Sequence, residues 1–527
     1  MNKNQPIYLA IAMAFGLLLG SLINSKGKSI LSITKTSSNE EKVKKLMNYI
    51  DNDYVDQVNT DELLDDAIAQ MLEKLDPHST YIPKENLQAI TENMQGNFVG
   101  IGVQFRIIND TITVLHTIEG GPSIKAGIKD GDRILIADKD TLYGKGINND
   151  YVLKTLKGAP NSNVNLQIYR KMNNSIFSTN VSRGKIKLKS VDVSYMLNDS
   201  IGYIKIDRFA RTTYDEFKES LDELLAQNMT DLVLDLRGNG GGFLDIANKI
   251  CDEFLEDDKL IVFTKNNKGD IFESFATSQG DFEKGGLYVL IDENSASASE
   301  IVAGALQDND KGTIIGRRSF GKGLVQEEMD LGDGSAVRLT TARYYTPTGR
   351  SIQKAYTDAK TNKNIGNKSY QEDISSRYNT GELFSKDSIK IIDSLQYTTP
   401  KGKIVYGGGG IIPDVFVPID TTGYVPTFFY KDINDFAFEY VDSNRKQLSQ
   451  LSLQDFLKEY NQNDVILNKF LNTNQSFKNL SIKTKKALKD YLKNNIVRVL
   501  FDDEDLYKVI HSEDKMLNKV FELEKQD

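Results

Sequence analysis

Ser297 is the side chain in this sequence that is best placed for covalent chemistry. It lies in a segment of small residues, 292–300, which joins an apolar strand-like run to a helical pattern. Ser297 and Glu300 have the Ser-x-x-Glu spacing of a capping box, which places the serine at a helix N-terminus. There the helix dipole favours a developing negative charge beside the hydroxyl. On this segment alone, a serine that only caps its helix explains the pattern better than a nucleophile does.

Lys322 is a candidate general base for that serine. It lies between two glycines, and the strand-like run that follows puts Lys322 and Gln326 on one face. A lysine accepts a proton only when neutral, so burial must lower its pKa from about 10.4 by roughly three units, which costs on the order of 4 kcal/mol. Gln326 can orient the amine by a hydrogen bond without adding a negative charge, which would raise this pKa.

A glycine-rich turn at 238–242 could bind an anion. It follows the strand-like segment 231–237 and leads into a helical pattern, so its backbone N–H groups are suited to either a phosphate or an oxyanion. A phosphate loop needs Gly-Lys-Ser/Thr or a GxGxxG frame, and neither occurs here. An oxyanion loop needs a nucleophile nearby, and Ser297 provides one.

The composition argues against several other kinds of chemistry. The 527 residues carry 65 Lys and Arg against 74 Asp and Glu, and this net charge of −9 argues against nucleic-acid binding. The single cysteine, Cys251, leaves cysteine-rich metal sites without ligands. The three histidines form no HExxH pattern, and His78, after Pro77, is expected to cap or pack a turn. We therefore expect no metal and no other cofactor.

Composition and hydrophobic periodicity divide the chain into five regions. An apolar run at 7–23, flanked by lysines, favours an uncleaved signal anchor over a cleaved signal or a buried core helix. The predicted regions are an anchor and linker (1–30), a helical region (38–90), a β-rich domain (91–185), an α/β core (186–420) and a helical extension (421–527).

The β-rich domain begins with a loop suited to peptide binding. A glycine loop before a strand lets backbone N–H groups converge on the carboxylate of a peptide that adds as an extra strand. The predicted loop residues are Val99, Gly100, Ile101 and Gly102. The turn-rich stretch 126–134 adds weight to this interpretation, and an ordinary β-barrel with tight turns is the alternative.

Taken in order, these segments resemble the carboxyl-terminal processing proteases, also called tail-specific proteases, a family of serine peptidases with an inserted PDZ domain. The resemblance covers residues 40–420. Its motifs are LDPHST (75–80), the loop at 98–102, RGNGGG (237–242), SASASE (295–300), FGKG (320–323) and YTPTGRSIQ (345–353). The resemblance implies a multidomain α/β protein with a ClpP/crotonase-like peptidase core, a PDZ-like β-rich domain and helical N- and C-terminal extensions.

The resemblance also implies roles for individual residues. Ser297 would be the nucleophile, Lys322 the base and Gln326 the third member of the triad. The oxyanion donors would be the backbone amides of Ala298 and Gly241. Cleavage would occur near the C-termini of exported or membrane proteins through an acyl-enzyme, and the PDZ-like domain would capture the flexible C-terminus.

We therefore expect a serine endopeptidase at the cell envelope. It would be anchored in the inner membrane by its N-terminal segment and face the periplasm, or be secreted if that segment is cleaved. Its partners would be protein substrates with flexible C-termini, the membrane, and a second copy of the chain or an adaptor protein, but not nucleic acid. Two other classes stay open: an inactive PDZ scaffold that binds C-terminal peptides, and a phosphate- or nucleotide-binding enzyme built on the glycine-rich turn.

Overall fold

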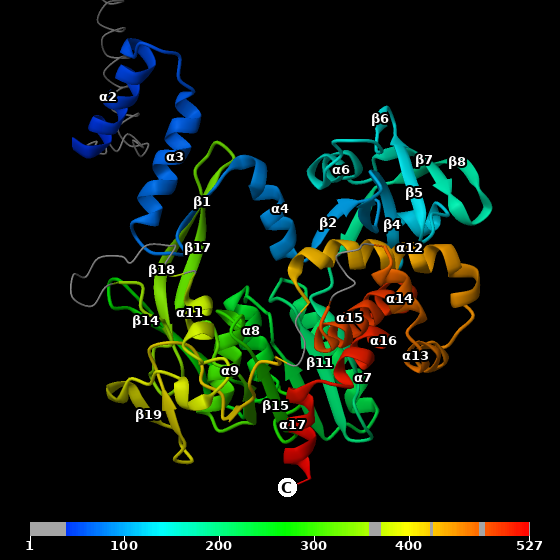
Figure 1. Ribbon diagram of the computed structural model, residues 1–527. Helices are drawn as coiled ribbons and strands as arrows, with labels where there is room; N and C mark the ends of the chain where they lie inside the picture. Colours follow the sequence, from blue (N-terminus) through cyan, green and yellow to red (C-terminus); the bar gives the residue numbers. More distant parts are fainter. Residues whose placement is uncertain (1–37, 358–369, 371, 422–424, 474–479, 526–527) are drawn as a thin grey trace, which may run out of the picture. The chain divides into compact units, whose positions relative to one another are not determined.

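The computed structural model describes residues 38–357, 370, 372–421, 425–473 and 480–525 (Figure 1). The chain divides into two compact units, with the division between Met71 and Leu72. The predicted signal anchor at 1–30 lies outside the described residues. Among the residues that are described, no helix is both long enough and apolar enough to cross a bilayer.

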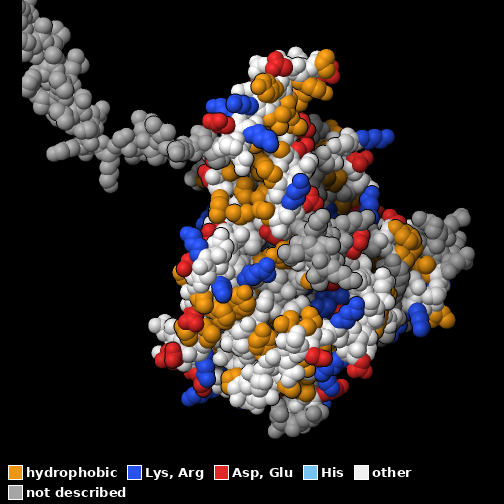
Figure 2. Space-filling model, turned by 90° about the vertical axis from the view of Figure 1, so that its left-hand side faces the viewer, with side chains coloured by type: hydrophobic (Ala, Val, Ile, Leu, Met, Phe, Trp, Pro, Cys, Tyr) orange, Lys and Arg blue, Asp and Glu red, His pale blue; other side chains and the backbone are white. Residues whose placement is uncertain are grey.

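The first unit contains the two helices predicted from apolar spacing, α2 (Ser38–Asp53) and most of α3 (Thr60–Glu73). No side chain of α2 is buried, and its apolar residues Val43, Leu46 and Tyr49 are 51%, 56% and 62% exposed. Apolar side chains of these helices lie open on the surface (Figure 2). These helices are therefore not held by a core of their own.

The β-rich domain is an antiparallel sheet with the order β3-β4-β5-β7-β8. Alternate strand residues point into its core, where Ile112, Val114 and Ile134 are fully buried. The strands are β3 (Val103–Ile108), β4 (Thr111–Thr117), β5 (Asp132–Ala137), β7 (Asn163–Arg170) and β8 (Ser175–Ser182), with helices α5 (Pro122–Lys125) and α6 (Asn149–Leu156). The chain enters and leaves the domain through paired strands β2 (Asn97–Gly100) and β9 (Gly184–Lys187).

The α/β core is built on a six-stranded sheet with the order β10-β11-β12-β15-β16-β21. All neighbours are parallel except the pair β10 and β11. The elements are β10 (Val191–Met196), β11 (Ile201–Ile206), β12 (Asp231–Asp235), β15 (Gly286–Ile291), β16 (Thr313–Gly316), β21 (Val415–Phe416), and helices α7 (Thr213–Ala226), α8 (Leu244–Asp252) and α9 (Ala298–Asp308). Because β12 and β15 are parallel neighbours, the loops that follow them emerge at one edge.

A second, antiparallel sheet has the order β1-β18-β13-β14, with β17 paired to β18. Its strands are β1 (Thr80–Ile82), β13 (Leu260–Asn266), β14 (Ile271–Phe275), β17 (Leu324–Asp330) and β18 (Ala336–Tyr345). In β18, Arg338 lies opposite Thr80 of β1, and Thr340 lies opposite Gln326 of β17. This sheet thus joins the LDPHST motif to the strand that follows Lys322, although the two are more than 240 residues apart.

The helical C-terminal extension touches both domains. It consists of α12 (Tyr430–Leu448), α13 (Leu453–Gln462), α14 (Val465–Leu471), α15 (Ile482–Leu500), α16 (Asp503–His511) and α17 (Lys515–Glu524). Asp442 of α12 forms ion pairs with Arg133 and Lys171 of the β-rich domain, at 2.7 and 3.0 Å. Asp514, before α17, forms an ion pair with Arg237 of the core at 2.6 Å. The extension therefore connects the two domains through ion pairs whose carboxylates, those of Asp442 and Asp514, are largely buried.

Candidate active site

Ser297 is the N-cap residue of α9, as the sequence predicts, and the predicted capping box is formed. Its N–H donates to the Glu300 carboxylate at 2.9 Å. The backbone of Ser297 has φ 55° and ψ −114°, a conformation that a residue with a side chain rarely adopts. Such strain persists only where surrounding contacts enforce it, and it occurs often at functional sites.

Glu300 joins two loops of the site, a role that the sequence analysis missed. The side chain is fully buried and accepts hydrogen bonds from the Ser319 hydroxyl at 2.5 Å and from the N–H groups of Gly321 and Lys322 at 2.7 and 2.8 Å. Burial raises its pKa, and these hydrogen bonds oppose the rise. One carboxylate therefore fixes the N-terminus of α9 against the segment that carries Lys322. The capping box was visible in the sequence, but the partners around residue 320 were not.

The pKa of the Lys322 amine is lowered, the direction that the sequence analysis requires of a general base. Its Nζ donates to Gln326 Oε1 at 2.8 Å, and its pKa falls from the ordinary 10.5 to about 8. Burial is the main cause and the Arg338 charge adds to it, whereas Glu300 and Asp76 oppose the fall. Lys322 itself precedes β17, which begins at Leu324 with a bulge before Gln326. The lysine and the glutamine thus meet across an irregular turn and not along a regular strand face.

His78 packs beside this pair, as expected for a residue of the turn. Its ring Nε2 lies 2.9 Å from the Tyr370 hydroxyl, and the two rings meet edge to face. Burial, with a contribution from the Lys322 charge, lowers the pKa of His78 to about 4. The ring is therefore neutral at pH 7. The backbone carbonyl of His78 accepts a hydrogen bond from Gln326 Nε2.

The glycine-rich turn lies directly against Ser297. A Cβ on Gly241, which has φ +102°, would come within 2.7 Å of the Ser297 Cβ and 3.0 Å of the Ala298 nitrogen, so only glycine fits here. The Gly241 N–H, a predicted oxyanion donor, donates to Asn239 Oδ1 at 2.8 Å. In this conformation an oxyanion would have to displace that side chain. Ala298, the other predicted donor, is the first residue of α9 and has its N–H at the positive end of the helix.

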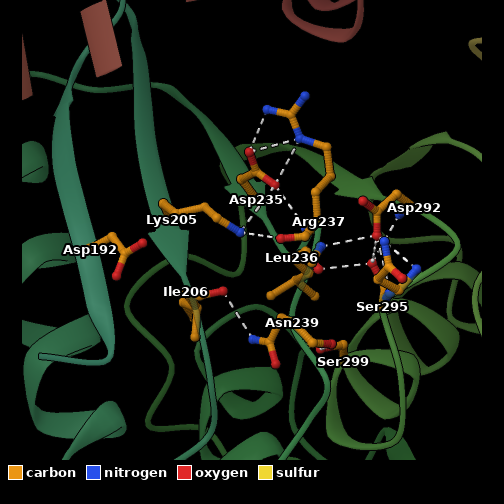
Figure 3. Close-up of polar contacts among 12 residues, drawn as sticks. Asp192, Lys205, Ile206, Asp235, Leu236, Arg237, Asn239, Asp292, Ser295 and Ser299 are labelled. Carbon is orange, nitrogen blue, oxygen red and sulfur yellow. Dashed lines mark hydrogen bonds and ion pairs between the residues drawn. The ribbon is translucent and has the colours of Figure 1, made fainter. Parts of the chain in front are cut away.

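Polar contacts, most of them buried, hold the glycine-rich turn against the serine segment (Figure 3). Asn239 Nδ2 donates to the Ile206 carbonyl at 3.0 Å, and the Asn239 carbonyl accepts from the Ser299 hydroxyl at 3.0 Å. The Ser295 hydroxyl donates to the Leu236 carbonyl at 2.8 Å, and the Gly238 N–H donates to the Asp292 carboxylate at 3.0 Å. The loops that follow β12 and β15 are therefore fixed to each other before any substrate binds.

An ion-pair network supports the start of the glycine-rich turn. The buried Asp235 carboxylate accepts from the Arg237 guanidinium, and Lys205 contacts the Arg237 carbonyl (Figure 3). The Asp235 carboxylate also accepts from the Tyr203 hydroxyl at 2.6 Å. Burial works in the opposite direction, but Arg237 and Lys205 hold the pKa of Asp235 well below its usual range. Arg237 also pairs with Asp514 of the C-terminal extension. The extension thus contacts the residue that leads into the turn.

A cavity of about 490 Å³ exposes the candidate residues to a ligand. Ser297, Lys322 and Gln326 line it together with residues 240–242. Apolar side chains contribute to its wall, and Arg208, Glu328 and Arg338 contribute charges. The apolar lining includes Met94 at the end of helix α4 (Lys84–Gln95), Phe243, Leu244, Ile301, Leu324 and Tyr344.

The predicted peptide-binding loop is part strand and part turn. Val99 and Gly100 belong to β2 and pair with β9. Ile101 is buried, and its carbonyl accepts from the N–H and the hydroxyl of Ser123 at 3.0 and 2.7 Å. Gly102, with φ +78°, turns the chain into β3. In the sheet as described, β3 is the terminal strand, so a peptide strand could pair with its outer edge.

Comparison with known proteins identifies the families of several regions of the chain. Residues 200–362 match peptidase family S41, and residues 99–181 match the PDZ domain. Residues 22–86 match the N-terminal domain of the activating protease CtpB, and residues 431–502 match a family of unknown function, DUF8443. The β-rich domain is therefore a PDZ domain, and the alternative of an ordinary β-barrel falls away.

Several bacterial proteases are similar over most of their own length. A carboxy-terminal-processing protease of Bartonella bacilliformis is 37% identical over 305 residues, which are 57% of this chain and 69% of that protein. A probable CtpA-like serine protease of Staphylococcus aureus strain MRSA252 is 32% identical over 67% of this chain and 72% of that protein. The carboxy-terminal processing protease CtpB of Bacillus subtilis is 34% identical over 60% of this chain and 65% of that protein.

The chain belongs to the family of carboxy-terminal processing proteases. It is a serine protease of that family with a PDZ domain, a mixed α/β core and helical extensions. The phosphate-binding alternative for the glycine-rich turn is thereby superseded.

Proposed function

We propose that this protein is an endopeptidase in which Ser297 is the nucleophile, Lys322 the general base and Gln326 the support of that base. The observation that carries the proposal is that the Lys322 amine, hydrogen-bonded to Gln326 at 2.8 Å, lines the same cavity as Ser297. Burial there lowers the pKa of Lys322 to about 8. At that pKa about a tenth of the lysine is neutral at pH 7, compared with less than about a thousandth for an ordinary lysine.

In the proposed reaction, Ser297 Oγ attacks the substrate carbonyl carbon while its proton moves to the free electron pair of Lys322 Nζ. The negative charge that forms on the substrate oxygen faces the Ala298 N–H and the glycine-rich turn. The C–N bond then breaks, and Lys322 returns the proton to the leaving amine. A water molecule attacks the carbonyl carbon of the resulting ester and gives a proton to Lys322. The bond from that carbon to Ser297 Oγ then breaks, and Lys322 passes the proton to Ser297 Oγ, which restores the free hydroxyl and the neutral amine.

The proposed substrate is a protein with a flexible C-terminus. The PDZ domain supports this proposal because such domains bind an extended C-terminal peptide along a sheet edge, and β3 offers one. The apolar lining beside Ser297 favours apolar residues around the scissile bond. An exported or membrane-associated substrate would suit a protease anchored at the cell envelope by its residues 7–23, as the sequence predicts.

The test is cleavage of a protein with a flexible apolar C-terminus by purified full-length enzyme. We expect Ser297→Ala and Lys322→Ala to lower kcat by at least about a thousandfold, because the proposed nucleophile and base act as a unit. Exposed residues of the same domain provide matched controls, Ser278→Ala and Lys259→Ala, and these should retain full activity. Undiminished turnover in Ser297→Ala or Lys322→Ala would refute the assignment.

A serine-reactive phosphonate separates the proposal from an inactive PDZ scaffold. The wild-type protein should be labelled at Ser297, with a rate that rises as Lys322 loses its proton near pH 8. Binding of C-terminal peptides without labelling between pH 6 and pH 10 would instead identify a scaffold. The proposed anchor has its own test, because mass measurement of the N-terminus in membrane fractions distinguishes a retained segment from a cleaved one.

A further inference from the structure

The orientation of the Gln326 amide decides whether it helps or hinders Lys322. Gln326 Oε1 accepts from Lys322 Nζ, which leaves the electron pair of a neutral amine free to take a proton. A flipped amide would direct its NH2 group at Lys322 and donate into that electron pair. The flipped form would therefore compete with the proton of Ser297 for the same electrons.

The carbonyl of His78 selects the productive orientation. It accepts a hydrogen bond from Gln326 Nε2. A carbonyl oxygen has no proton to donate, so the end of the amide that faces it must be the NH2 group. The oxygen end must then face Lys322. A backbone atom about 250 residues earlier in the sequence thus fixes the side chain that orients the amine.

The buried Asp76 holds the His78 carbonyl in place through a tight turn. Asp76 Oδ1 accepts from the N–H groups of His78 and Ser79 at 2.8 and 2.9 Å, and Oδ2 accepts from the Ser79 hydroxyl at 2.6 Å. Pro77 restricts the backbone between them. The side chain of Asp76 is engaged almost entirely within this turn, which accounts for an acidic residue that is only 5% exposed.

The same strand pair that carries Gln326 also anchors the turn. The Thr340 hydroxyl donates to Asp76 Oδ1 at 3.1 Å, and the Thr340 N–H donates to the Ser79 hydroxyl at 3.1 Å. Thr340 lies opposite Gln326 in the pairing of β17 with β18. The turn and the glutamine are therefore positioned against a common residue, which keeps their separation fixed.

We propose that the turn at 76–79 is a positioning element for the base: Asp76 holds the His78 carbonyl where it locks the Gln326 amide in the orientation that leaves the Lys322 electron pair free. This inference rests on the proposed roles of Ser297 and Lys322. Asp76 touches neither substrate nor the reacting atoms, so it is a positioning residue. The neutral ring of His78 adds no positive charge beside Lys322, and the charges that do act on the amine are those of Arg338, Glu300 and Asp76.

A double-mutant cycle tests whether Asp76 acts through Gln326. We expect Gln326→Ala and Asp76→Ala each to lower kcat by about tenfold, the equivalent of one lost hydrogen bond to a charged or catalytic group, with KM changed less than about twofold. The kcat of the double variant should fall no further than that of the worse single variant. Once Gln326 is replaced, the position of the His78 carbonyl no longer affects Lys322, so the loss of Asp76 has no further effect. Losses that multiply to about a hundredfold would overturn the inference.

The charge of Asp76 has a separate signature. Asp76→Asn keeps Oδ1 as an acceptor, and its NH2 group can donate to the Ser79 hydroxyl, so the turn is retained. Because the Asp76 charge opposes the fall in the Lys322 pKa, its removal should move the acid limb of the kcat profile to lower pH while the maximal kcat stays within about threefold. A merely electrostatic role predicts the same shift in Asp76→Ala with no loss of maximal kcat, and that result would overturn the inference.

Two further measurements keep the outcomes distinct. If Asp76→Ala does not fold, Ser79→Ala removes one contact of the turn and replaces it in the cycle with Gln326→Ala, with the same expected non-additivity. Activity that survives in Ser297→Ala overturns the proposed function together with this inference. An inactive Lys322→Ala combined with multiplying losses in the cycle overturns the inference alone.

Discussion

Replacing Lys322 by methionine should make the protein more stable at neutral pH and inactive at every pH. The pKa of Lys322 falls from 10.5 to about 8 on folding. Below pH 8 the amine is charged in both the folded and the unfolded chain, so the folded state bears the whole penalty of burying that charge. As the pH rises from 8 towards 10.5, the folded state loses the proton first, and the penalty shrinks.

The size of this effect follows from the two pKa values. A difference of about 2.5 pKa units corresponds to about 3 kcal/mol of destabilisation at pH 7 and to less than about 1 kcal/mol at pH 10. Methionine is close in size but loses the hydrogen bond to Gln326, which costs about 1 kcal/mol at both pH values. We therefore expect Lys322→Met to raise the free energy of unfolding by about 2 kcal/mol at pH 7 and to leave it unchanged at pH 10.

Urea unfolding at pH 7 and pH 10, followed by far-UV circular dichroism and tyrosine fluorescence, measures this difference. The free energies of the variant and the wild type are compared at each pH, so that general effects of alkaline solution cancel. Lys259→Met, at an exposed site of the same domain, is the matched control and should give no pH-dependent difference. A Lys322→Met difference that changes by less than about 1 kcal/mol between the two pH values would refute the burial argument, and with it the reason for naming Lys322 as the base.

Two further predictions concern buried or shared polar contacts. Glu300→Gln turns one acceptor into a donor that faces backbone N–H groups. The free energy of unfolding should therefore fall by about 2–4 kcal/mol, and the rate of peptide cleavage should fall more than tenfold. An unchanged urea midpoint would contradict this prediction. The His116 ring lies 3.1 Å from Asp130 and 2.9 Å from the Arg498 carbonyl of α15, and the hydrogen bond to Asp130 raises its pKa above 6.5. This contact is complete below pH 6.5 and weakens as the pH rises through the raised pKa. Hydrogen exchange at the end of α15, corrected for its intrinsic rate, should therefore quicken from pH 6 to pH 8.5 in the wild type and not in His116→Gln.

The local features of the site could be predicted because they depend on spacing along the chain. Ser297 and Glu300 form a capping box because residues three apart meet in the first turn of a helix. Lys322 and Gln326 are only four residues apart and make the expected contact, although the lysine precedes the strand. The family and its fold class also followed from the sequence, because its motifs occur in a fixed order.

The free N–H groups of the glycine-rich turn could not be predicted from the local sequence. The spacing indicated an anion-binding turn, but a run of glycines does not reveal which N–H groups are free. In the structure Asn239 Oδ1 accepts a hydrogen bond from the Gly241 N–H, and the Asn239 NH2 group donates one to the Ile206 carbonyl. That arrangement depends on the neighbouring strand β11, which lies outside the motif.

The sequence by itself determined the family to which the chain belongs, and its motifs supplied the residues that we propose to carry the chemistry. The tertiary structure decided what surrounds them: Glu300 against the loop at 319–322, the carbonyl of His78 against Gln326, and Asp514 against Arg237. The physical reason is that these contacts join segments 19 to 277 residues apart. Their meeting depends on which strands and helices become neighbours in the fold, and the periodicity of a single segment carries no information about that order.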